Sequence, residues 1–114
     1  MKIFTVILLL FSIEIFAEDK VLTFQVAGKL YEYCQSENFE LTAYCYGALT
    51  AIADAEIVNH VTFDRPLSFC IPSGVEPSQL SKVYLNYMDD NPQELHKVGA
   101  VAVMNSFEKA FPCK

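Results

Sequence analysis

Positive charge is scarce in this sequence of 114 residues, which has 8 Lys and Arg against 14 Asp and Glu and a net charge of −6 at pH 7. A protein that binds nucleic acid needs a basic surface facing the phosphates, and this chain has too few basic residues to build one. The same shortage disfavours binding to an anionic membrane surface. We therefore expect no nucleic-acid partner, whereas a basic protein partner fits the charge.

Enzyme signatures are also missing. The sequence contains no H-E-x-x-H motif, no glycine-rich phosphate loop, and no Ser-His-Asp or paired-carboxylate pattern. Neither His60 nor His96 stands at a ligand-like spacing from a cysteine, which disfavours a zinc site. A catalytic pair of Cys70 with one of these histidines stays formally open, although no flanking motif supports it. We expect a protein that is not an enzyme and needs no cofactor.

The sequence has one long apolar run, and it is at the N-terminus. Residues 3–13 are almost all apolar, follow Lys2, and precede Ala17 and the polar Glu18. This order is typical of a secretory signal peptide, here residues 1–17 with cleavage before Glu18. A membrane anchor is the alternative, but a helix needs about 20 apolar residues to cross the bilayer. We expect export of a single domain, residues 18–114, without stable membrane insertion.

Four cysteines lie in the expected mature domain: Cys34, Cys45, Cys70 and Cys113. An even number of cysteines in a small exported domain predicts two disulfides. Four cysteines allow three pairings, so the number alone does not decide the connectivity.

Apolar residues recur at helical spacing in four stretches, residues 24–34, 41–58, 77–88 and 91–110. The last stretch opens with Asn91 and Glu94 at the spacing of a capping box. The pattern predicts an all-α fold, a small bundle of about four helices stapled by two disulfides. In an up-down bundle, Cys34 and Cys45 share one end and Cys70 and Cys113 the other. We favour these pairs, with the other two pairings still open.

Between the second and third stretches, residues 59–74 have no helical period and contain Pro66, Pro72 and Gly74. Sixteen residues is long for a loop in a compact domain. Loops of this length are often functional, so this segment is a candidate binding element.

Several motifs together resemble a known family. They are CYGALTAIADA at residues 45–55, FCIP at 69–72, NPQELH at 91–96 and AFPC at 110–113. In their order and spacing these motifs are similar to those of the Rap/Tai family of type VI secretion immunity proteins. The resemblance covers residues 30–113. Ala48, where the family more often has a bulkier residue, and Gly99, where alanine is expected, depart from the pattern and leave the toxin subtype open.

The resemblance implies a periplasmic, helical and dimeric protein. Such a protein binds and occludes a peptidoglycan-cleaving amidase toxin delivered by sibling cells, and so protects the producer and its siblings. Its partners are the cognate amidase effector and a second copy of itself. Six tyrosines, more than a small core buries with every hydroxyl satisfied, agree with an interface between copies.

The candidate toxin-binding residues lie in the loop at residues 59–68: His60, Phe63, Asp64 and Arg65. Phenylalanine and arginine are residue types that anchor interfaces. The plainer interpretation is that Phe63 packs the loop onto the bundle.

Three other features stand out, and the first two have two interpretations each. The acidic residues Asp89, Asp90 and Glu94 steer a basic toxin or form a solvated turn with helix-start charges. Asp54 is a solvated or structural carboxylate, or it is a contact residue. Gly47, Ala51 and Ala55 form one small face against which another helix can pack.

An alternative function is that of a periplasmic acid-stress chaperone, which is also small, exported, helical and dimeric. Such chaperones typically have one disulfide and unfold at low pH. The two disulfides expected here argue against that role.

Overall fold

The computed structural model describes residues 23–114, so the signal peptide predicted at residues 1–17 lies outside the described residues. The elements are α1 (Ala27–Gln35), α2 (Phe39–Phe63), α3 (Pro77–Asp90), the short 3-10 helix η1 (Pro92–His96) and α4 (Gly99–Ala110). Residues 23–114 contain no named strand, which confirms the all-α prediction. None of the helices in this range is long and apolar enough to cross a membrane.

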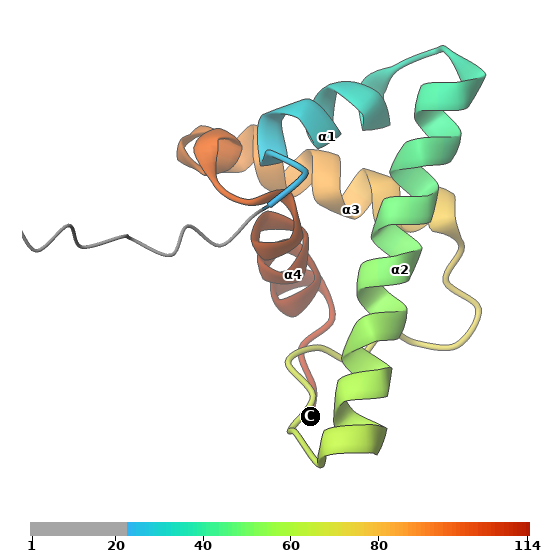
Figure 1. Cartoon of the computed structure of the whole chain (residues 1–114), viewed down its shortest axis with the longest axis vertical. Helices are drawn as coiled ribbons and strands as arrows, with labels where there is room; N and C mark the ends of the chain where they lie inside the picture. The colour runs from blue at the N-terminus through green and yellow to red at the C-terminus, as the bar shows by residue number, and fades with distance from the viewer. Residues whose placement is uncertain (1–22) are drawn as a thin grey trace, which may run out of the picture.

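The four α-helices form two pairs that cross each other. In Figure 1, α2 and α4 run down the view, whereas α1 and α3 run across its upper part. α1 packs on α2, α3 and α4, and α2 also packs on α3 and α4. The arrangement therefore differs from a simple up-down bundle, and only the first half of α2 lies where the other helices meet.

Each α-helix contributes a fully buried side chain to the core. Leu30 of α1, Leu49 of α2, Tyr84 of α3 and Phe107 of α4 have 0 to 1% of their surface exposed. The Tyr84 hydroxyl donates a hydrogen bond to the Ala27 carbonyl oxygen at 2.7 Å. Burial raises the pKa of Tyr84 far above its usual value, because the ionised phenol would lose its hydration.

Two disulfides hold the fold together, and both have the predicted pairing. Cys34, in the last turn of α1, is bonded to Cys45 in α2, with a Cα–Cα distance of 5.1 Å. Cys70 is bonded to Cys113, with a Cα–Cα distance of 5.0 Å. From the lengths of the loops they close, the chain-entropy model assigns the first about 3 kcal/mol of stabilisation and the second about 4 kcal/mol.

The fourth helix does not begin where the sequence predicted it. Residues 92–96 form η1, the backbone is extended at Lys97 and Val98, and α4 starts at Gly99. The cause is a pairing with the segment before α1. The N–H of Gly99 donates to the carbonyl oxygen of Gln25 at 2.7 Å, and the N–H of Ala27 donates to that of Lys97 at 2.9 Å. A β-carbon at position 99 would lie 3.1 Å from the Gln25 carbonyl oxygen, which explains the glycine.

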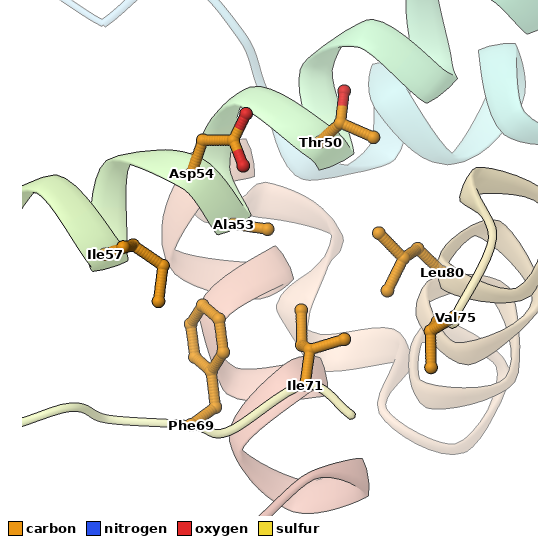
Figure 2. Close-up of a pocket in the computed structure, with 8 residues that line it drawn as sticks. All are labelled: Thr50, Ala53, Asp54, Ile57, Phe69, Ile71, Val75 and Leu80. Atoms are coloured by element: carbon orange, nitrogen blue, oxygen red, sulfur yellow. The ribbon is translucent and has the colours of Figure 1, made fainter. Parts of the chain in front are cut away.

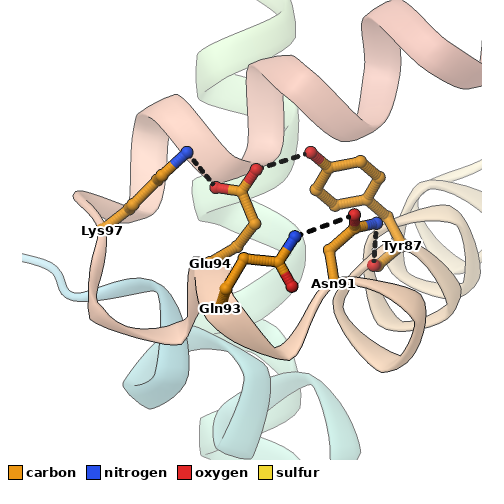
Figure 3. Close-up of polar contacts among 5 residues, drawn as sticks. All are labelled: Tyr87, Asn91, Gln93, Glu94 and Lys97. Carbon is orange, nitrogen blue, oxygen red and sulfur yellow. Dashed lines mark hydrogen bonds and ion pairs between the residues drawn. The ribbon is translucent and has the colours of Figure 1, made fainter.

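The predicted capping box at Asn91 and Glu94 is also wrong. The Asn91 side chain donates to the carbonyl oxygen of Tyr87 at 2.8 Å, back into the last turn of α3. Glu94 is 5% exposed, accepts from the Tyr87 hydroxyl at 2.8 Å and pairs with the Lys97 ammonium at 2.9 Å (Figure 3). Lys97, and then Tyr87, lower the pKa of Glu94. Burial, and then Glu94, raise the pKa of Tyr87 to about 12.

Candidate partner-binding site

The distal half of α2, residues 51–63, presents large apolar side chains to solvent. The exposed fractions are 53% for Ile57, 54% for Val58, 75% for Val61 and 63% for Phe63. This half is the part of α2 that extends below the crossing helices in Figure 1. A group of apolar side chains exposed together on one element is typical of an interaction surface.

The helix continues through part of the predicted loop, so the expected boundaries of that loop are wrong. His60 and Phe63 belong to α2, Asp64 is its C-cap in the left-handed conformation (φ 52°, ψ 39°), and Arg65 follows. The His60 Nδ1 atom bonds the carbonyl oxygen of Arg65 at 2.6 Å. The structure thus brings the four candidate residues together at one exposed end of α2, whereas the sequence placed them along a loop.

Residues 64–76, here called the strap, connect α2 to α3 and are tied down on both sides. The buried carboxylate of Glu56 in α2 accepts a hydrogen bond from the N–H of Ser68. On the other side, the N–H of Cys70 donates to the carbonyl oxygen of Phe111 at 2.8 Å, next to the disulfide to Cys113. Between these ties, Phe69 is buried. Its ring lies edge-on to that of Phe107, 5.4 Å between centroids. The strap is therefore a fixed part of the surface.

A cleft of about 250 Å³ lies between α2 and the strap. Its lining residues are Thr50, Ala53, Asp54, Ile57, Phe69, Ile71, Val75 and Leu80. Figure 2 shows Phe69 and Ile71 of the strap facing Ala53 and Ile57 of α2, with the Asp54 carboxylate along the α2 side. The Thr50 hydroxyl donates to the Tyr46 carbonyl oxygen at 2.8 Å within α2. Asp54 makes no hydrogen bond or ion pair within residues 23–114, so it is the uncommitted polar group of this cleft.

The three acidic residues Asp89, Asp90 and Glu94 have different surroundings in the structure. Asp89 accepts a hydrogen bond from the Tyr31 hydroxyl, and Glu94 is buried with Tyr87. Asp90 alone of the three borders a second cleft, of about 300 Å³, between α3 and α4. The Asp89 contact also raises the pKa of Tyr31.

The small face of Gly47, Ala51 and Ala55 is exposed. A β-carbon added to Gly47 would meet no atom within 4 Å, so no helix within residues 23–114 packs there.

Chemistry at these surfaces is limited by the cysteines. Cys70 is bonded to Cys113, so its sulfur is not available as the thiolate that a Cys–His pair requires. Within the described range, no group of three or more His, Cys, Asp or Glu side chains is placed to hold a metal ion.

The sequence interpretation singled out Asp54 but missed the apolar walls of its cleft. Thr50, Asp54 and Ile57 are spaced by four and three residues, which places them on one side of a helix. This spacing was a usable signal. The contribution of Phe69 and Ile71 depends on the path of the strap, which local patterns do not reveal.

In a comparison with family models, residues 27–113 match the Rap1a immunity proteins. The match runs from the first residue of α1 to the last disulfide cysteine. Comparisons with curated proteins and with solved structures give no match. Because the matched segment is far more than half of the chain, the chain belongs to the Rap1a immunity protein family.

Proposed function

We propose that this immunity protein acts in the periplasm, where it binds and occludes the active site of a type VI secreted peptidoglycan amidase and so protects the producer and its siblings. Family membership supports a toxin partner and favours immunity over the chaperone alternative. The apolar run at residues 3–13 and the two disulfides support action outside the cytoplasm. The amidase class comes from the motif resemblance.

The exposed apolar end of α2 is the observation that carries this proposal. Phe63 is 63% exposed beside Arg65, and both are residue types that anchor protein interfaces. An inhibitor that fills a groove needs no chemistry of its own, only a surface that is already ordered. Two hydrogen bonds hold this end in one conformation. The Ser68 N–H donates to the Glu56 carboxylate, and His60 Nδ1 bonds the Arg65 carbonyl oxygen. Binding therefore costs little ordering entropy.

The second part of the proposal is a homodimer formed through the exposed face of α2. This face is uncharged over about five turns and consists of Tyr44, Gly47, Ala51, Ala55, Val58 and Thr62. In a two-fold symmetric dimer, the same face of both copies meets. The small residues let the two α2 helices approach closely. Ala51→Glu places a charge in the middle of the face, and we expect a monomer by light scattering. Ala100→Glu, at an exposed position of α4, is the matched control and should leave the dimer intact.

Protection of cells tests the inhibitory role. A candidate amidase is exported to the periplasm of a host cell together with this chain, and lysis is followed by optical density. We expect the full chain to prevent lysis and a chain without residues 2–17 to fail. The double variant Phe63→Ala with Arg65→Ala should lose most protection. Full protection by that variant contradicts the assignment of this surface, and lysis with the full chain against every amidase tried contradicts the function.

A further inference from the structure

We propose that the cleft between α2 and the strap receives one lysine or arginine side chain of the toxin, with Asp54 as its counter-ion. This inference rests on the proposed function and specifies how the partner is recognised. The observations behind it are the shape of the cleft, the kind of atoms that line it, and its position beside the exposed end of α2.

The lining combines apolar walls with one free carboxylate. Ile57, Phe69 and Ile71 are apolar, and the Thr50 hydroxyl is committed to α2, so that Asp54 is the group left to direct polar recognition. In Figure 2 its carboxylate lies on the α2 side of the cleft, near Ala53 and away from Phe69 and Ile71. Lysine and arginine have the matching composition, an aliphatic stem that packs on apolar surface and a cationic head.

A purely apolar occupant fits this cleft poorly. Such a group would cover the Asp54 carboxylate and remove its water without supplying a hydrogen bond, which is costly for a charged group. A cation supplies both charge and donors to the same carboxylate. The net charge of −6 on the chain favours approach of a basic surface over an acidic one.

The size and position of the cleft indicate a protein side chain and not a free small molecule. Its volume of about 250 Å³ lies below the range of roughly 300–1,000 Å³ that is typical of small-molecule pockets. Ile57 lines the cleft and is also 53% exposed, one helical turn before Val61 on the surface assigned to the toxin. A toxin seated on the end of α2 can therefore extend a side chain into the cleft.

The test is the affinity of Asp54 variants for the amidase that the chain neutralises in cells, measured by calorimetry on the purified mature proteins. We expect Asp54→Asn to weaken binding at least about tenfold, equivalent to about 1.4 kcal/mol. Asp90→Asn makes the same charge change beside the other cleft and should stay within about twofold of the parent. Added salt should weaken the parent complex more than the Asp54→Asn complex.

A second pair of variants separates charge from shape. Asp54→Glu keeps the carboxylate and should retain most of the affinity, whereas Ala53→Leu fills the cleft and should lose it. If Asp54→Asn binds the amidase within twofold of the parent, the inference is overturned. If in addition Ala53→Leu loses binding, the cleft is occupied by an apolar side chain. If Asp54→Asn loses self-association but keeps toxin binding, the cleft is occupied by a second copy of this chain. That result also overturns the inference. If the parent chain binds no amidase, the proposed function fails together with this inference.

Discussion

The two halves of α2 have similar apolar content, but only the first half contains buried apolar side chains. Cys45 and Leu49 in the first half have 0% exposure, whereas Val61 and Phe63 near the end have 75% and 63%. α1, α3 and α4 pack on α2, and in Figure 1 the strap and the C-terminus lie near its distal half. Apolar composition therefore does not by itself locate the core. In the distal half it marks an exposed apolar surface, which we propose a partner covers.

This contrast divides the expected effects of substitution. A side chain in the first region contributes to the free energy of unfolding, because folding removes it from water. A side chain exposed in the folded chain gains little from folding and can contribute only when a partner covers it. Stability and toxin affinity should therefore respond to different residues.

The largest expected loss of stability comes from Phe107→Ala, because Phe107 is fully buried and contacts Phe69 where the strap meets the core. Removing a buried phenylalanine ring typically costs about 3–5 kcal/mol in transfer and cavity terms. Urea unfolding followed by circular dichroism measures it. A loss below about 1 kcal/mol would mean that the core described here does not support the fold.

The disulfides come next and sharpen the comparison. Replacing Cys70 and Cys113 by alanine should cost about 4 kcal/mol, and replacing Cys34 and Cys45 about 3 kcal/mol, because the first pair closes the longer loop. The first change also releases one side of the strap, so it should weaken toxin binding as well. Unfolding and calorimetry on both variants test this. Equal affinities for the toxin would show that the strap does not shape the binding surface.

Glu94 gives a smaller and pH-dependent effect. Glu94→Gln should cost about 1–3 kcal/mol at neutral pH, because it weakens a buried charged contact with Tyr87 and Lys97. The folded pKa of Glu94 lies below its ordinary value of 4.5, so its contribution is present above that value. The contribution is lost as the pH falls through the lowered folded pKa.

Unfolding of parent and variant across acidic pH measures this difference, which should shrink as the pH falls. Glu32→Gln is the matched control, since Glu32 forms a Lys–Glu pair at the same spacing, but with both side chains more than half exposed. It should change stability by less than about 0.5 kcal/mol. A difference for Glu94→Gln that does not depend on pH would contradict the assigned role of the carboxylate.

Local patterns predicted the helix number, because amphipathic spacing depends on neighbours in the chain. The favoured disulfide pairs are confirmed, although the up-down bundle from which they were inferred is not the observed arrangement. They failed where distant segments decide the structure. The pairing of residues 25–27 with 97–99 interrupts the expected fourth helix, and no sequence pattern near Val98 predicts this pairing. α2 was expected to end at Val58, because residues 59–74 have no helical period and contain two prolines and a glycine. It continues to Phe63, since no proline or glycine intervenes before Pro66.

The candidate site was predictable in kind but not in shape. Phe63 and Arg65 were singled out as residue types that anchor interfaces, and the structure puts them at one exposed end. That the segment is partly helical, and that a cleft opens beside it, depends on the ties of the strap to Glu56 and Phe111. These contacts join residues 12 and 41 positions apart, beyond the reach of helical or turn spacing.

The most direct test of the account compares two exposed phenylalanines at opposite ends of α2. Phe39, the first residue of the helix, is 84% exposed, and Phe63, the last, is 63% exposed. Both alanine variants should unfold within about 0.5 kcal/mol of the parent. Calorimetric titration with the amidase should show at least about tenfold weaker binding for Phe63→Ala and a change within about twofold for Phe39→Ala. Equal losses, or a larger loss at Phe39, would contradict the claim that the distal end of α2 is the toxin-binding surface.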